Sequence, residues 1–171
     1  MTYMRRMLAG AVGFLLLSAC ALDTVEGLRT YLGKWLFLGQ ETHFISKASC
    51  TVAVFELQSN TLRSTTPKRA ENLRDALLGI KRGQAVWFDI PGMTPHQISE
   101  GIMSLDLPIG LGLTASAIGP ARDCIRGPSI TNGFRAVITS EEAVTLYDPA
   151  QNALILLYPP EGLVLFMRGN V

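Results

Sequence analysis

The sequence contains two imidazole side chains that could act as bases or bind a metal ion, His43 and His96. His96 and Glu100 are four residues apart, a spacing that places both on one face of a helix. With His43 they would make a set of two histidines and one carboxylate, which is a known type of metal site. One His/Glu pair at this spacing arises easily by chance, and His96 falls in the first turn of a predicted helix. We therefore expect neither a metal nor another cofactor.

A nucleophile for hydrolysis would have to come from Ser99, three residues after His96, or from a free thiol at Cys50 or Cys124. A serine hydrolase of the common type carries its nucleophile on a strained turn in a G-x-S-x-G motif, which this sequence lacks. A cysteine nucleophile needs a free thiol with a lowered pKa. No catalytic set is complete, so we expect a non-enzymatic protein and keep a hydrolase that uses His96 as a second alternative.

The N-terminal segment has the anatomy of a secretory signal. Arg5 and Arg6 precede an apolar stretch over 8–17, which is too short to span a bilayer as a mature helix. The sequence Leu-Ser-Ala-Cys at 17–20 resembles the lipobox of bacterial lipoproteins. The resemblance implies cleavage of residues 1–19, acylation of Cys20 and a mature lipid-anchored domain over 20–171. Because Ala21 rather than Asp follows Cys20, the resemblance also implies sorting to the outer membrane, facing the periplasm.

Two cysteines remain if Cys20 carries lipid. In an oxidising compartment Cys50 and Cys124 are expected to form one disulfide. The alternative is a pair of separate buried thiols. A zinc site is not expected, because neither cysteine belongs to a C-x-x-C pair.

The segment 107–121 contains no charged residue. Its glycines and prolines make it poor material for a regular element, and it is too short for a transmembrane helix. An exposed apolar run of this kind can bind a lipid or a protein partner. We therefore predict partial exposure, with Leu111 and Leu113 as the contact residues.

Composition excludes several classes of protein. The chain has 171 residues, 48% hydrophobic and 17% charged, which indicates a folded protein and fits a single domain. Its 15 basic and 14 acidic residues give a net charge of +1, and no basic stripe is present. Nucleic acid is therefore not an expected partner.

Three helices are predicted ahead of the uncharged segment, over 24–32, 67–82 and 95–105. Asp23 and Glu26 have the spacing of a capping box for the first, and Pro67 is suited to the first position of the second. The third has the clearest start, because Thr94, Pro95 and Gln97 combine a capping box with a proline at the first helical position.

Runs of β-branched and aromatic residues predict the strands. Three are expected at 34–38, 51–57 and 85–90, and a loop covers 123–133. Four more follow at 134–139, 143–147, 153–158 and 163–167, joined by connections so short that neighbouring strands must be antiparallel. The predicted fold class is α+β, with an antiparallel sheet, a C-terminal four-strand meander and two or three helices packed on one face.

These patterns lead to a ranked set of functions. The first is a lipid-anchored periplasmic module that binds or scaffolds an envelope protein partner, with the membrane contacted through acylated Cys20. The alternative is a small-ligand or lipid binding protein whose pocket lies between the helices and the sheet, near 102–119. The hydrolase that uses His96 stands third.

Overall fold

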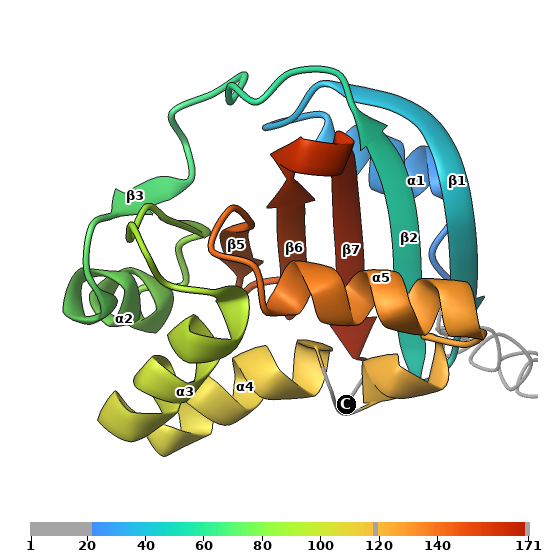
Figure 1. Cartoon of the computed structure of the whole chain (residues 1–171). Coiled ribbons are helices and arrows are strands. Elements are labelled where there is room, and N and C mark those ends of the chain that lie inside the picture. Colours follow the sequence, from blue (N-terminus) through green and yellow to red (C-terminus); the bar gives the residue numbers. More distant parts are fainter. Residues whose placement is uncertain (1–21, 118–119, 170–171) are drawn as a thin grey trace, which may run out of the picture.

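A seven-stranded sheet forms the centre of the computed structural model, which describes residues 22–117 and 120–169 (Figure 1). The strands lie in the order β1-β2-β7-β6-β5-β4-β3. Neighbours are antiparallel except β3 and β4, which are parallel. This arrangement confirms the predicted α+β class. The strands are β1 (Leu38–Lys47), β2 (Cys50–Leu57), β3 (Lys68–Ala70), β4 (Val86–Phe88), β5 (Val144–Asp148), β6 (Ala153–Tyr158) and β7 (Leu163–Gly169).

The predicted signal segment 1–19 and the acylation site Cys20 lie outside the described residues. Within 22–117 and 120–169, no helix has both the length and the apolar character needed to cross a membrane.

The C-terminal meander has three strands, β5, β6 and β7, instead of the predicted four. A short 3-10 helix, η2 (Pro159–Glu161), connects the last two. The run 134–139, predicted as the first strand, instead belongs largely to the helix α5 (Pro128–Ile138). Ile130, Phe134 and Val137 recur at the spacing of one helical face, and this period outweighs the strand preference of the β-branched residues in the run.

Helices cover both faces of the sheet, which corrects the expectation that they pack on one face. α1 (Val25–Leu32) lies behind the sheet in Figure 1, and α2 (Leu73–Lys81), α3 (Pro95–Leu105), α4 (Leu107–Ala117) and α5 lie in front. Side chains alternate along the central strands, so Val52 and Val54 of β2 belong to the core under α2–α5, whereas Ala53 and Phe55 belong to the core under α1. The central strands are apolar on both faces for this reason.

Capping residues define two helix starts differently from the sequence prediction. Thr24, not Asp23, caps α1 through its side chain, and α2 starts later than predicted, with Asn72 as its cap. Asp23 instead forms an ion pair with Arg168 and accepts a hydrogen bond from Thr51, which ties the start of the described chain to the sheet. The predicted capping box of α3, made by Thr94 and Gln97, is confirmed.

The uncharged segment forms a helix, α4, in place of the irregular structure that its glycines and prolines predicted. Gly110 is buried where α4 meets α3, and a Cβ at this position would overlap the side chain and backbone of Met103. The glycine therefore permits close packing of two helices rather than breaking one. A short 3-10 helix, η1 (Pro120–Asp123), follows.

Candidate functional site

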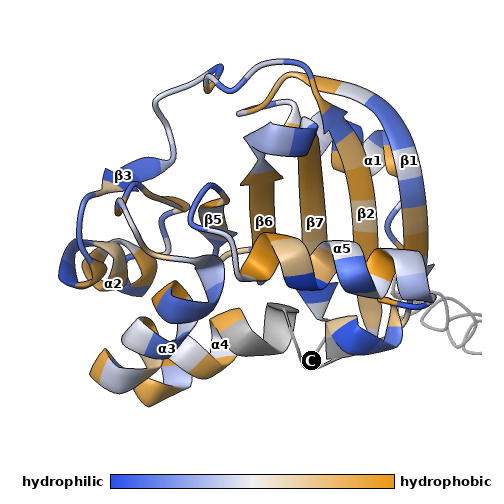
Figure 2. Ribbon diagram, in the orientation of Figure 1, coloured by the Kyte–Doolittle hydropathy of each residue, from blue (hydrophilic) through white to orange (hydrophobic). Residues whose placement is uncertain are grey.

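A cavity of about 310 Å³ lies between α5 and the face of the sheet formed by β1, β2 and β7. Its floor consists of side chains that lie next to one another on the antiparallel strands β1, β2 and β7. Val54 pairs with His43 on one side and with Leu165 on the other, and Val52 pairs with Met167 in the adjacent row. Directly paired residues point to the same face of a sheet, so the floor is mainly apolar, with Thr42 and His43 of β1 as its polar residues. Figure 2 shows the apolar strands β7 and β2 passing behind α5.

α5 forms the roof of this helix–sheet cavity. Ile130, Gly133, Phe134 and Val137 line it and occupy one stripe of the helix at i, i+3, i+4 and i+7. A Cβ at Gly133 would meet no atom within 4 Å, so the roof has no packed neighbour at this point. Gly133 is exposed as well as lining the cavity, so it lies where the cavity opens to solvent.

His43 provides a polar group on the cavity wall. Its Nε2 atom is buried and has no hydrogen-bond partner among the described residues. A buried polar atom without a partner costs free energy, on the order of 1–3 kcal/mol. A ligand in the cavity that offers a hydrogen-bonding group to Nε2 would recover that cost.

A disulfide between Cys50 and Cys124 fixes one side of the cavity and confirms the predicted pairing. Cys50 begins β2 and Cys124 directly follows η1, so the bond anchors the segment that leads into α5. Ile125, the next residue, lines the cavity. The disulfide therefore fixes the position of the segment before α5 relative to β2.

A second hollow, an open cleft of about 600 Å³, borders the cavity on the other side of α5. Three guanidinium groups line it, from Arg122 in η1, Arg126 after it and Arg135 in α5. Arg126 donates through Nε to the backbone oxygen of Asp123 at 2.8 Å. Arg122 and Arg135 have no ion-pair partner within the described part of the chain. We call this hollow the arginine cleft.

His96, the histidine of the predicted His/Glu pair, lines the arginine cleft. His96 Nε2 lies 3.4 Å from Glu100 Oε1, and both side chains are about half exposed, so the predicted pair on one helix face is confirmed. Ser99 is buried, whereas His96 faces solvent. His43 lies at the other hollow, and the described residues hold no cluster of three or more His, Cys, Asp or Glu side chains able to bind a metal ion.

The structure separates the two leucines predicted as contact residues. Leu111 is 51% exposed, but Leu113 is fully buried in the core under α2–α5. The expected exposure of Leu113 is therefore wrong: the two leucines are two residues apart, about 200° around the axis of α4, so their side chains point in different directions. Leu111 instead shares an exposed face with Leu107, four residues earlier, and Leu105 at the end of α3 is also exposed.

The sequence interpretation missed the lining of the cavity and the arginine cleft. The helical period of Ile130, Phe134 and Val137 is a signal for the roof, but the β-branched residues of 134–139 predict a strand there. The arginines are scattered between 122 and 135 and form no stripe in the sequence, so only folding brings them to one cleft.

Comparison of the chain with protein-family models, with curated proteins and with solved structures gives no match. Function is therefore inferred from the cavity, the cleft and the exposed leucines of the chain itself.

Proposed function

We propose that this protein is a non-enzymatic binding protein that holds a small, mainly apolar ligand in the helix–sheet cavity. The observation that carries the proposal is the cavity itself: about 310 Å³, with a mainly apolar floor and roof and a buried His43 Nε2 that has no partner among the described residues. Ligand sites of proteins are typically apolar hollows of about 300–1,000 Å³ with a few polar groups that fix orientation.

The proposal moves the predicted helix–sheet pocket to a different part of the chain. The sequence placed it near 102–119, whereas the cavity is formed by α5 and by strands β1, β2 and β7. The proposal includes a lipid anchor at Cys20 that holds the protein on the periplasmic face of the outer membrane, supported by the lipobox pattern at 17–20. Loss of alkyne fatty-acid labelling in Cys20→Ser is the expected result, and equal labelling would contradict the anchor.

Photoaffinity labelling tests the cavity directly. The full chain is held in lipid nanodiscs, since a detergent would itself compete for an apolar cavity, and is labelled with a diazirine derivative of dodecanol. Labelled peptides should come from α5 and from β7. Gly133→Leu, which adds a side chain to the roof stripe where space is open, should lower this labelling roughly tenfold, a change of about 1.4 kcal/mol in binding.

Gly133→Ala is the matched control. It changes the same position and, like leucine, favours the helix over glycine by about 1 kcal/mol, but it adds too little volume to close the cavity. It should label like the unchanged protein. Labelling that survives Gly133→Leu, or that falls only on the opposite core around α1, would contradict the proposed site.

A second function, binding of an envelope protein partner, is favoured by the exposed leucines at the junction of α3 and α4. Leu105, Leu107 and Leu111 are 44%, 58% and 51% exposed. A leucine cluster on one corner of a surface is typical of a protein contact. Leu111→Glu should abolish capture of a partner by this corner and leave photolabelling of the cavity unchanged, which separates the two functions.

A further inference from the structure

The helix–sheet cavity and the arginine cleft adjoin each other. Ile125 and Phe134 line both hollows. Ile125 follows the disulfide-anchored Cys124, and Phe134 is half-buried in the middle of α5. These two side chains therefore lie between the two hollows. A ligand that extends from one hollow into the other would pass them.

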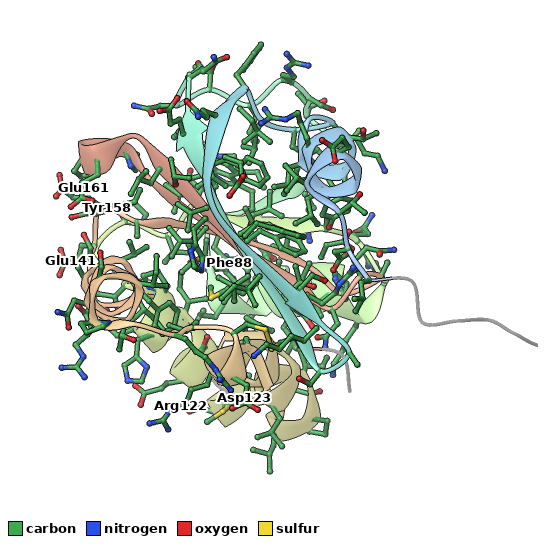
Figure 3. The ribbon with its side chains drawn as sticks, turned by 90° about the vertical axis from the view of Figure 1, so that its right-hand side faces the viewer. Phe88, Arg122, Asp123, Glu141, Tyr158 and Glu161 are labelled. Atoms are coloured by element: carbon green, nitrogen blue, oxygen red, sulfur yellow. A yellow bond between two sulfur atoms is a disulfide. The ribbon has the colours of Figure 1, made fainter. Side chains whose placement is uncertain are left out.

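The two ends of this combined site differ in charge. Glu161 of η2 lines the cavity at one end, whereas Arg122, Arg126 and Arg135 line the cleft. Figure 3, which views α5 end-on, shows Glu161 on one side of the helix and Arg122 with Asp123 on the other. A negatively charged group is repelled by the carboxylate end and attracted to the guanidinium end.

We infer that the ligand is a single-chain amphiphile with an anionic head group, carboxylate or phosphate. Its chain occupies the helix–sheet cavity and its head group binds in the arginine cleft. This inference rests on the proposed function and names the class of ligand. Guanidinium groups suit carboxylates and phosphates because their planar array of donors matches the paired oxygens of both.

The size of the cavity fits one chain. A water molecule takes about 30 Å³ in the liquid, and a methylene group is of similar size. The cavity of about 310 Å³ therefore has room for roughly ten such groups. A diacyl lipid would need a second hollow of the same kind for its second chain.

The other charged groups of the cleft leave it positive. Asp123 contributes one carboxylate against three guanidinium groups. His96 lies at the cleft beside Glu100, at 3.4 Å, so that pair adds no net positive charge when the histidine is protonated. The exposed position of the arginines places the head group near water, which means that salt should weaken its binding.

Competition for the photoaffinity label tests this inference. The full chain in nanodiscs is labelled with the diazirine derivative of dodecanol, and four unlabelled competitors are compared: dodecanoate, dodecyl phosphate, dodecanol and dodecyltrimethylammonium. Inorganic phosphate alone forms a fifth arm. The two anionic amphiphiles should compete roughly tenfold better than dodecanol. The cationic amphiphile should compete less well than dodecanol, and phosphate alone should not displace the label.

The double variant Arg122→Gln/Arg135→Gln should reduce competition by both anions to the level of dodecanol while dodecanol itself is unaffected. The control Arg74→Gln/Arg82→Gln makes the same change in net charge on α2 and its C-cap, away from the cleft, and should behave like the unchanged protein. Equal competition by anionic, neutral and cationic chains would overturn the inference but not the proposed function. Displacement by phosphate alone would overturn it too, and failure of every chain to compete would contradict the proposed function itself.

Discussion

Cys50, the first residue of β2, is joined by a disulfide to Cys124, the residue after η1, with 6.1 Å between their Cα atoms. The bond connects the floor of the helix–sheet cavity to the segment that leads into its roof. Two residues 74 positions apart in the sequence thus fix one edge of the site. Ile125, which lines the cavity, directly follows this edge, and α5 begins shortly after it.

Removal of this disulfide should weaken both the fold and the site. In the chain-entropy model, closing a loop of this length contributes about 4 kcal/mol to stability. Cys50→Ala/Cys124→Ala should therefore lower the free energy of unfolding, measured with urea, by about 2–4 kcal/mol, and should reduce photolabelling of α5. The unchanged protein after reduction serves as the control and should lose a similar amount. A variant as stable as the unchanged protein would show that the bond does not hold η1 to the sheet.

His43 should lower stability and add ligand selectivity. Its buried Nε2 has no partner among the described residues, so His43→Phe, which keeps a ring of similar size, should raise the melting temperature. A ligand with a hydroxyl at the end far from its head group should use this nitrogen.

The matching ligand test compares ω-hydroxydodecanoate with dodecanoate. One hydrogen bond contributes about 0.5–1.5 kcal/mol, so the hydroxylated chain should compete for the label roughly threefold to tenfold better. His43→Phe should remove that preference. A variant that is less stable and keeps the preference would show that His43 has a structural role only.

Leu111 and Leu113 should respond oppositely to a charge. Leu111 is about half exposed, so Leu111→Glu should change stability by less than about 0.5 kcal/mol. Leu113 is fully buried, and Leu113→Glu should unfold the protein, because an unpaired buried charge costs several kcal/mol. Thermal melting of both variants, read by circular dichroism, checks this. Equal melting temperatures would contradict the packing of α4.

Tyr31 should make the protein sensitive to high pH. Its hydroxyl donates to Asp148 Oδ2 at 2.7 Å, which attaches α1 to β5. Burial, and then the hydrogen bond and charge of Asp148, raise the pKa of Tyr31 above its ordinary value. The folded state therefore holds this proton more tightly than the unfolded state. The resulting stability is complete below about pH 10, the ordinary pKa of tyrosine, and is lost as the pH rises further.

Denaturation with urea at several pH values measures this effect. Stability should decline above about pH 10, and Tyr31→Phe should make the decline less steep. At neutral pH the same variant should lose about 1–3 kcal/mol, because Asp148 is buried and gives up one donor. An unchanged alkaline slope in Tyr31→Phe would show that other groups cause it.

Local signals predicted much of the fold. The capping box of Thr94 and Gln97 marked the start of α3, and the run 51–57 marked β2. The errors came where tertiary contacts decide the outcome. Gly110 looks like a helix breaker in the sequence, but it lets α4 pack closely on Met103 of α3. The β-branched residues of 134–139 suggest a strand, but the period of Phe134 and Val137 places them on a helix that faces the sheet.

The candidate site was harder to predict, since its components are far apart in the sequence. The sequence suggests His43 only as a possible base or metal ligand, because its place beside Val54 on the cavity floor depends on the pairing of β1 with β2. The cavity lies where α5 crosses the sheet, with the exposed Gly133 at its edge. No residue pattern predicts how far a helix lies from a sheet. The sequence offers two local signals, the helical period of Ile130, Phe134 and Val137 and the disulfide partner Cys124.

Methyl NMR of the full chain in nanodiscs, titrated with dodecanoate, tests whether a ligand binds between α5 and the sheet. If the ligand occupies the helix–sheet cavity, the methyl signals of Val52, Val54, Leu165 and Val137 should shift together and saturate. The signals of Leu28, Leu32 and Val164, which belong to the opposite core, should stay in place. Shifts confined to the exposed Leu107 and Leu111, or no saturable shift at the four cavity residues, would contradict ligand binding between α5 and the sheet.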